Sequence, residues 1–195
     1  MKRITIPIIL IIVVSAVVAF ILRGRHNREA KAQPLQAQAR ADQPEGYYIT
    51  GRIVAIANGR EEVLATWVKQ GDNKRGWRMD QNYLDKQGRA NRQIRQWCIV
   101  GQGVFIQNVE TGNLRKLGPC NLYPPDYDGV SGEHMNERAI VRFDTHEGST
   151  FERLVSPRLG TVLKLTHTFP KGTVVRDEAL TINYQSAPDD IFVLP

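Results

Sequence analysis

Three histidines of this chain have neighbours that could support acid-base or metal chemistry. His134 lies in a stretch rich in proline and glycine, and no second histidine stands at metal-ligand spacing from it, which predicts a surface side chain. Asp144, His146 and Glu147 are close together, but they predict a solvated turn between two strands. His167 occupies the apolar phase of its strand and predicts a hydrogen-bonded core residue or a ligand-facing one. The sequence therefore predicts no catalytic residue and no metal ligand.

Motifs that mark common reactions do not occur in the sequence. There is no Gly-x-Ser-x-Gly elbow, phosphate loop, dinucleotide fingerprint or His-Glu-x-x-His pair. We therefore expect a protein that binds rather than catalyses and that needs no cofactor.

Cys98 and Cys120 are the two cysteines of the chain. In an oxidising compartment they could close a disulfide around the intervening hairpin, and the alternative is two buried thiols. Neither belongs to a Cys-x-x-Cys pair or follows the apolar run in the manner of a lipidation site. Redox catalysis and lipid modification are therefore not predicted.

An uncharged apolar run covers residues 4–22, between Lys2-Arg3 and a basic flank that begins at Arg23. At about 1.5 Å per residue, a helix of this length crosses most of a roughly 30 Å hydrocarbon core. The run predicts one transmembrane helix that acts as a signal anchor. The alternative is a signal peptide cleaved after Ala19, which would release a secreted form. The apolar residues that follow Ala19 favour the anchor.

The rest of the chain divides at residue 46. Residues 1–3 are a basic N-terminal flank, and residues 23–46 combine a basic flank with a flexible tether rich in Ala, Gln and Pro. Residues 47–195 have the usual size of one domain. The charges beside the apolar run slightly favour a cytoplasmic domain, but the short charged N-terminus and the β-rich domain outweigh them. We expect the domain on the extracytoplasmic, periplasmic side of the cell membrane.

The formal net charge of +6 belongs mostly to the part next to the membrane. Residues 1–46 hold seven Lys or Arg and three Asp or Glu, a net +4, which leaves +2 for the domain. The basic residues would therefore meet anionic lipid head groups. The basic cluster of the domain, formed by Lys86, Arg89, Arg92 and Arg95, is explained by a solvated strand edge. No nucleic-acid partner is predicted.

The domain is predicted to be mainly β, with short strands separated by turns. Asn58-Gly59 predicts a hairpin turn between two strands rich in Ile, Val, Tyr and Trp, and Phe-Pro-Lys-Gly at 169–172 predicts a type I turn before the last strand. Residues 118–136 carry several prolines and glycines and predict an extended surface excursion without long regular elements. We expect about nine strands in a curved antiparallel sheet or incomplete β-barrel.

Both phases of the strand at residues 63–68 are apolar, and residues 53–56 repeat this pattern. A sheet with one wet face would alternate, so parts of this sheet must cover apolar groups on both sides. No amphipathic helix that could be the cover follows residue 46. Either the sheet closes on itself, or its concave side holds an apolar ligand. By residue type and phase, the candidate ligand-binding residues are Ile53, Ala65, Trp67, Ile94, Val104, Ile106, Leu163 and Leu165.

A targeting segment, a first hairpin, a Gly-Trp-Arg-Met-Asp step at 76–80, Ser-Pro-Arg-Leu-Gly at 156–160 and a closing Asp-Ile-Phe-Val-Leu-Pro at 190–195 follow one another in this chain. Over residues 47–195 this order resembles the outer-membrane lipoprotein carrier and sorting superfamily (LolA/LolB-like). The resemblance implies an incomplete, strongly curved antiparallel barrel whose apolar concave face accepts or senses acyl chains. The lid helices of that family have no counterpart here, and an anchored chain could not shuttle. An anchored acceptor or sensor is the form that suits this sequence.

We therefore expect a membrane-anchored extracytoplasmic β-domain that binds a lipid or acyl chain and is not an enzyme. The first alternative is a protein-binding assembly or regulatory subunit of an envelope complex, which docks through a sheet edge or through residues 118–136. The second alternative is a hydrolase with an unrecognised site.

Overall fold

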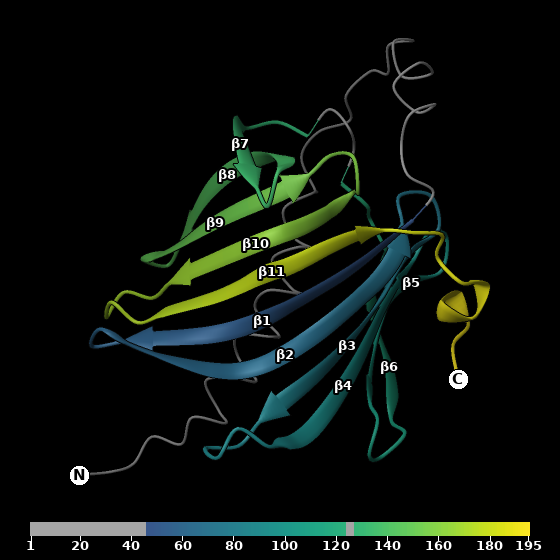
Figure 1. Cartoon of the computed structure of the whole chain (residues 1–195), viewed down its shortest axis with the longest axis horizontal. Coiled ribbons are helices and arrows are strands. Elements are labelled where there is room, and N and C mark those ends of the chain that lie inside the picture. Colours follow the sequence, from purple (N-terminus) through teal and green to yellow (C-terminus); the bar gives the residue numbers. More distant parts are fainter. Residues whose placement is uncertain (1–45, 124–126) are drawn as a thin grey trace.

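The computed structural model describes residues 46–123 and 127–195, and this part of the chain forms one open antiparallel sheet of 11 strands (Figure 1). The strands are β1 (Tyr47–Ala57), β2 (Arg60–Asp72), β3 (Gly76–Leu84), β4 (Ala90–Ile99), β5 (Gly103–Asn108), β6 (Leu114–Gly118), β7 (Val130–His134), β8 (Glu137–His146), β9 (Ser149–Ser156), β10 (Thr161–Thr168) and β11 (Val174–Tyr184). One 3-10 helix, η2 (Asp189–Phe192), follows the last strand. The mainly β prediction is confirmed.

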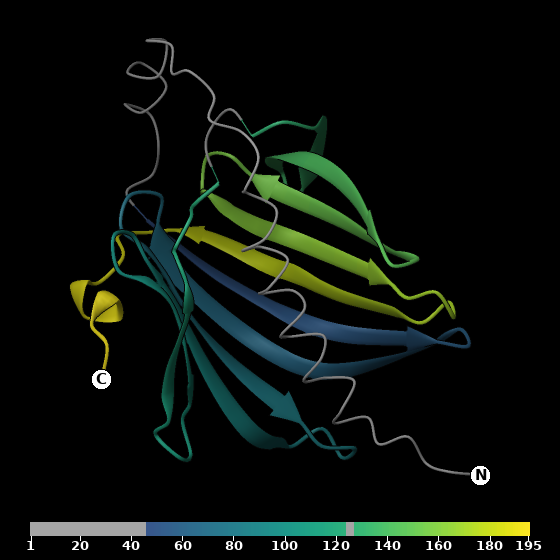
Figure 2. The same cartoon turned by 180° about the vertical axis from the view of Figure 1, so that it is seen from behind.

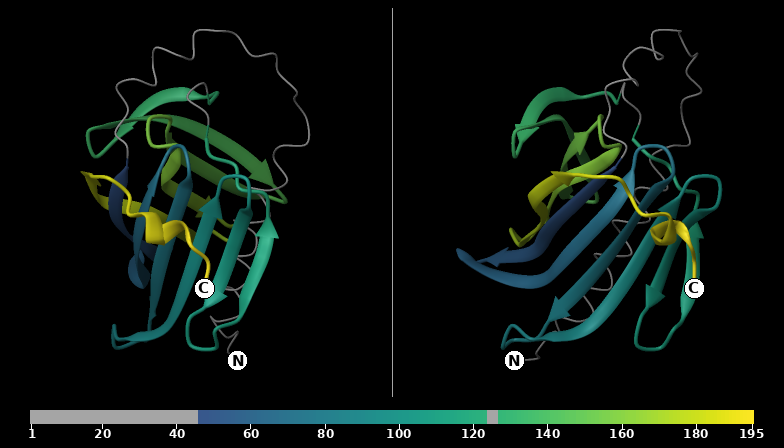
Figure 3. Two further views of the ribbon diagram at one scale, coloured as in Figure 1. Left: turned by 90° about the vertical axis from the view of Figure 1, so that its right-hand side faces the viewer. Right: turned by 45° about the vertical axis from the view of Figure 1, so that its right-hand side comes forward.

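Two meanders make up the sheet. The strand order is β6-β5-β4-β3-β2-β1-β11-β10-β9-β8-β7, so the first meander holds β1 to β6 and the second holds β7 to β11. They join where β1 pairs antiparallel with β11. Seen from behind and from the side, the sheet twists and curves, so that the two meanders are inclined toward each other (Figures 2 and 3). This curvature gives the sheet an inner face.

Two turns that were predicted from the sequence connect neighbouring strands in the structure. Asn58 and Gly59 have φ angles of 52° and 71° and connect β1 to β2, as a hairpin turn with two positive φ angles requires. Between β10 and β11, the backbone N–H of Gly172 donates to the carbonyl of Phe169 at 2.9 Å. Both turns therefore lie where they were predicted.

The expected number of about nine strands is too low, and one missed strand is β7. Residues 118–136 contain this regular element because Met135 and Asn136 both adopt positive φ angles, 55° and 62°, in a two-residue turn to β8. A methionine in the left-handed region is uncommon, so Met135 does not mark a turn in the sequence. The predicted surface excursion is correspondingly shorter and lies between β6 and β7.

The hairpin of β7 and β8 curls back over the second meander. Strands lie about 4.8 Å apart, so β7, four places from β11 in the sheet, would be roughly 19 Å away if the sheet were flat. Nevertheless, Nε2 of His134 lies 3.0 Å from the carbonyl oxygen of Ala179 on β11. The hairpin therefore lies over one side of its own sheet. The sequence after residue 46 predicts no amphipathic helix that could cover the sheet.

The main hydrophobic core lies on the inner face, along the junction of the two meanders. Its buried members are Tyr47, Ile49, Ile53, Ala65, Trp67, Met79, Tyr83, Ile94, Leu159, Leu163, Val175 and Ala179. No helix among residues 46–123 and 127–195 is long and apolar enough to cross a membrane. The predicted anchor at 4–22, the flank at 1–3 and all but the last residue of the tether at 23–46 lie outside the described residues.

Candidate ligand-binding site

The inner face of the sheet holds a cavity of about 150 Å³ between the two meanders. Its apolar wall includes Ile53, Trp67, Met79, Leu163, Leu165 and Val175. Strands β1 to β5 supply one side, and β10 and β11 supply the other, so the curvature of the whole sheet builds the cavity. A concave, mostly apolar space with a few polar groups is the usual form of a small-ligand site.

Trp67 occupies the centre of this wall because its partner across β1, Gly51, has no side chain. A Cβ atom at Gly51 would lie 2.1 Å from the Trp67 ring, so any larger residue would displace the indole. The indole is 3% exposed, and its Nε1–H donates to Oδ1 of Asp177 on β11 at 2.6 Å. Trp67 therefore forms an apolar surface and holds a carboxylate across the junction of the meanders.

Lys69 brings a buried amine to the same cavity. Lys69 is two residues after Trp67 on β2, so both side chains lie on the same face of the sheet. Its Nζ donates to Oγ1 of Thr161 on β10 at 3.2 Å. The amine also lies 5.3 Å from the ring centroid of Trp67 and 5.2 Å from that of Trp77. Two aromatic faces and one hydroxyl thus replace most of the water around this cation.

Burial changes the acid-base behaviour of both charged groups in the cavity. Desolvation lowers the pKa of Lys69, and the negative charge of Asp177 opposes this change. Desolvation raises the pKa of Asp177 to about 6, against the charge of Lys69 and the hydrogen bond from Trp67. The carboxyl group therefore titrates close to neutral pH, where an ordinary aspartate is fully ionised.

We expect Asp177→Asn to flatten the pH dependence of stability between about pH 4 and pH 6. Because the pKa of Asp177 is raised from 3.8 to about 6, the native state holds this proton more tightly than the unfolded chain does, and stability falls as pH rises through the window. The variant lacks this fall, which is on the order of 2 kcal/mol. Urea unfolding followed by tryptophan fluorescence measures it. Equal pH slopes for both proteins would contradict the assignment.

His167 lies at the other end of β10, between two aromatic rings. Its ring centroid is 4.1 Å from that of Phe151 and 3.8 Å from that of Phe169. The side chain is 5% exposed, and neither ring nitrogen has a hydrogen-bond partner among the described residues. Burial lowers its pKa, so the imidazole is neutral at pH 7. The sequence predicts His167 as a hydrogen-bonded core residue or a ligand-facing one. The described residues give its ring no hydrogen bond, and its side chain lines the cavity.

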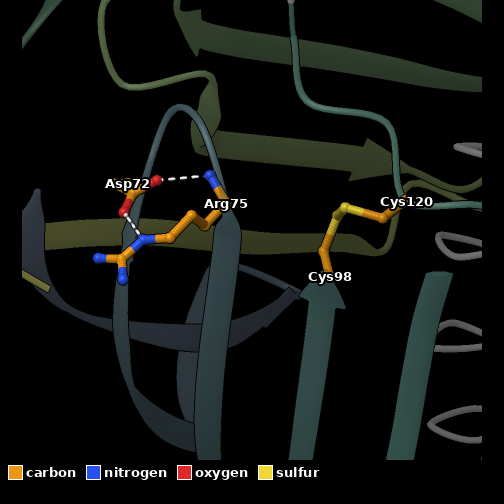
Figure 4. Close-up of a disulfide and its surroundings, with 4 residues drawn as sticks. All are labelled: Asp72, Arg75, Cys98 and Cys120. Atoms are coloured by element: carbon orange, nitrogen blue, oxygen red, sulfur yellow. Dashed lines mark hydrogen bonds and ion pairs between the residues drawn. A yellow bond between two sulfur atoms is a disulfide. The ribbon is translucent and has the colours of Figure 1, made fainter. Parts of the chain in front are cut away.

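A short segment after β6, residues 118–123, closes one end of the cavity, and we call it the strap. Cys98 at the end of β4 is bonded to Cys120 of the strap, with their Cα atoms 5.0 Å apart (Figure 4). On the opposite side, the backbone N–H of Tyr123 donates to the carbonyl of Gly160, between β9 and β10, at 3.2 Å. The strap therefore ties the first meander to the second. Pro119, Asn121 and Tyr123 line the cavity.

The structure divides the eight sequence-predicted residues into two groups on the same face. Five of them line the cavity: Ile53, Trp67, Val104, Leu163 and Leu165. The other three, Ala65, Ile94 and Ile106, belong to the hydrophobic core or pack against it and do not line the cavity. Ligand binding by any of them stays a prediction.

The two charged residues of the cavity, Lys69 and Asp177, were missed in the sequence. Lys69 continues the inward phase of Ala65 and Trp67, and Asp177 lies between the inward residues Val175 and Ala179. A charged residue in the apolar phase of a strand was the available signal. Trp77 also lies in the cavity wall.

The other candidate chemistries have ordinary structural explanations. The exposed cluster after β3 is paired, since Arg89 bonds Asp85 at 3.1 Å and Arg95 bonds Asp80. His146 lies 3.5 Å from the adjacent Glu147 at an exposed turn. No group of three or more His, Cys, Asp or Glu that could hold a metal ion occurs among the described residues.

The geometry defines a class of fold, an open and strongly curved antiparallel sheet with a ligand-sized hollow on its inner face. Two solved structures of the lipoprotein-sorting superfamily match part of this chain. A LolA superfamily protein from Nitrosomonas europaea matches with a TM-score of 0.39 and 9% identity, over 83% of this chain and 99% of that one. A putative outer-membrane lipoprotein-sorting domain from Vibrio parahaemolyticus gives 0.39 and 9%, over 80% and 94%. The predicted resemblance is confirmed, and it concerns the fold alone.

Particular similar structures include MucB of Pseudomonas aeruginosa. In a complex titled MucA/MucB, the match has a TM-score of 0.45 and 19% identity, over 80% of this chain and 58% of that one. The chain thus spans less than two thirds of the length of that relative. No protein-family model and no curated protein matches the sequence.

Proposed function

We propose that this chain is a membrane-anchored extracytoplasmic domain that binds an apolar ligand, a lipid or acyl chain, in the cavity of its sheet and catalyses no reaction. The apolar wall of the cavity is the observation that carries this proposal. Each methylene group of a ligand that moves from water onto such a wall makes the free energy of binding more favourable. The Cys98–Cys120 disulfide suits an oxidising compartment outside the cytoplasm. The apolar run at 4–22 supplies the anchor.

A protein-binding role is the second candidate, because the curled hairpin exposes apolar side chains. Val130 on β7 is 68% exposed and Phe143 on β8 is 67% exposed, although both lie in strands. A large exposed aromatic side chain on an edge hairpin is typical of a contact with another chain. In this reading, the domain is an assembly or regulatory subunit that docks an envelope protein.

Filling the cavity tests the first proposal. We expect Leu165→Trp to weaken the binding of a neutral apolar dye, N-phenylnaphthylamine, by about tenfold, because the larger ring occupies the space of the ligand. Lys164→Trp is the matched control, since Lys164 is the adjacent residue on β10 and does not line the cavity. Dye fluorescence in the presence of the full chain measures both.

Two results would contradict ligand binding in this cavity. One is a wild-type chain that binds no dye, and the other is equal dye affinity for Leu165→Trp and the wild type. Circular dichroism of both tryptophan variants shows whether the sheet is retained. A chain that binds no apolar ligand but captures an envelope protein through Phe143 would instead favour the second candidate.

A further inference from the structure

Lys69 is the one lysine or arginine among the described residues that line the cavity, which His167 also lines. Its side chain is 7% exposed, so almost no water reaches the ammonium group. An ammonium group has three N–H donors, and Thr161 is the hydrogen-bond acceptor that the described residues give it. A buried cation with unused donors loses free energy unless a ligand supplies acceptors. The amine is therefore the part of the cavity that a polar head group would occupy.

The cavity extends from Lys69 along β10. Thr161 and the strap lie at the end where β10 begins. Along β10 the wall continues through Leu163 to Leu165, four residues from Thr161 and hence roughly 13 Å away. Leu165 is the cross-strand partner of Asp177, so the apolar surface beside the chain of a head group at Lys69 ends where this carboxyl group lies.

The charge of the cavity limits the head group to one negative charge. Asp177 is the acidic residue among the described lining residues, and it already accepts the Nε1–H of Trp67. A cationic head would lie beside the Lys69 ammonium, and a neutral alcohol would offer it one acceptor oxygen where a carboxylate offers two. A head with several negative charges would exceed what one amine can neutralise next to a carboxylate. A single carboxylate can accept two of the Lys69 donors.

We propose that the cavity binds a medium-chain monocarboxylate, a fatty acid, with its carboxylate on Lys69 and Thr161 and its alkyl chain along β10 toward Leu165. This inference rests on the proposed function and names the ligand class of the same site. The cavity volume of about 150 Å³ is too small for the two chains of a phospholipid. Trp67 and Trp77 flank the head and keep water from the ion pair.

Decanoate and decanol, which share the chain and differ in the head, test the inference. The full chain is reconstituted in phosphatidylcholine nanodiscs, and empty nanodiscs are the blank. We expect the wild type to bind decanoate more tightly than decanol, and Lys69→Met to lose about ten- to a hundredfold in decanoate affinity, as for one charge-assisted hydrogen bond. The decanol affinity of Lys69→Met stays within about threefold of the wild type. The carboxyl carbon signal of ¹³C-labelled decanoate reports binding.

Asp177→Asn supplies the opposite change at the same site. It removes the negative charge beside Lys69 and keeps an oxygen that accepts the Trp67 hydrogen bond, so decanoate affinity rises by about fivefold at pH 7. A merely structural role of the pair would move decanoate and decanol affinities together and in the same direction for both variants. Lys164→Met, on β10 and outside the cavity lining, leaves both affinities unchanged.

Each outcome separates the two proposals. If neither ligand binds the wild type, the cavity does not hold apolar ligands and the proposed function fails with it. If both bind but Lys69→Met leaves their ratio unchanged, the cavity binds apolar chains without reading the head, and only the fatty-acid inference is overturned. Tighter binding of decanol than of decanoate overturns it as well.

Discussion

The Cys98→Ser/Cys120→Ser variant is expected to unfold with a free energy about 3 kcal/mol lower than that of the oxidised chain. The two cysteines are 22 residues apart, so the disulfide removes much of the freedom of this loop from the unfolded state. The bond also fixes the strap, whose other tie to the sheet is the backbone hydrogen bond from Tyr123 to Gly160 at 3.2 Å. Its loss should therefore loosen one end of the cavity as well as destabilise the sheet.

Urea unfolding of the full chain, followed by tryptophan fluorescence, measures this effect. Treatment of the wild type with a reductant should reproduce the loss, whereas the double serine variant should not respond to the reductant. Because serine is close to cysteine in size, a cavity term contributes little. A wild-type chain with equal stability before and after complete reduction would show that the strap does not depend on the disulfide.

Much of the sheet could be predicted because several of its turns contain residues that favour turns locally. Asn58-Gly59 and the turn at 169–172 each need backbone angles or a proline that few residues provide, so the sequence locates them directly. The turn after β7 uses Met135, which adopts φ = 55° under tertiary constraint and gives no local signal. The hairpin that curls over the second meander was therefore invisible in the sequence.

The cavity could be predicted only as a face, for a similar reason. Alternation along each strand places Ile53, Trp67 and Leu165 on one side, and the structure agrees. Alternation does not state which strands approach one another across the hollow, since that depends on the curvature of all 11 strands. Lys69 on β2 and Asp177 on β11 are far apart in sequence, and the pairing of both strands with β1 brings them together.

Glu137 is a buried carboxylate on the curled hairpin, and its partners are also far from it in the sequence. The Ser156 hydroxyl donates to its Oε1 at 2.8 Å, Arg158 bonds its Oε2 at 2.8 Å, and the Tyr184 hydroxyl donates to Oε2 as well. Glu137 is 3% exposed, and no local pattern marks it as a core residue. It therefore links β8 to the end of β9 and to β11.

We expect Glu137→Ala to lower the free energy of unfolding by about 3 kcal/mol, because it leaves the fully buried Ser156 hydroxyl and the Arg158 guanidinium without their shared acceptor. Glu137→Gln keeps one carbonyl acceptor, so it should lose about half as much. Glu133→Ala is the matched control, since this glutamate lies on the same hairpin and is exposed. Its effect should stay within about 0.5 kcal/mol. Urea unfolding of the three variants measures the series, and an alanine variant as stable as the control would show that the hairpin is held by apolar contacts instead.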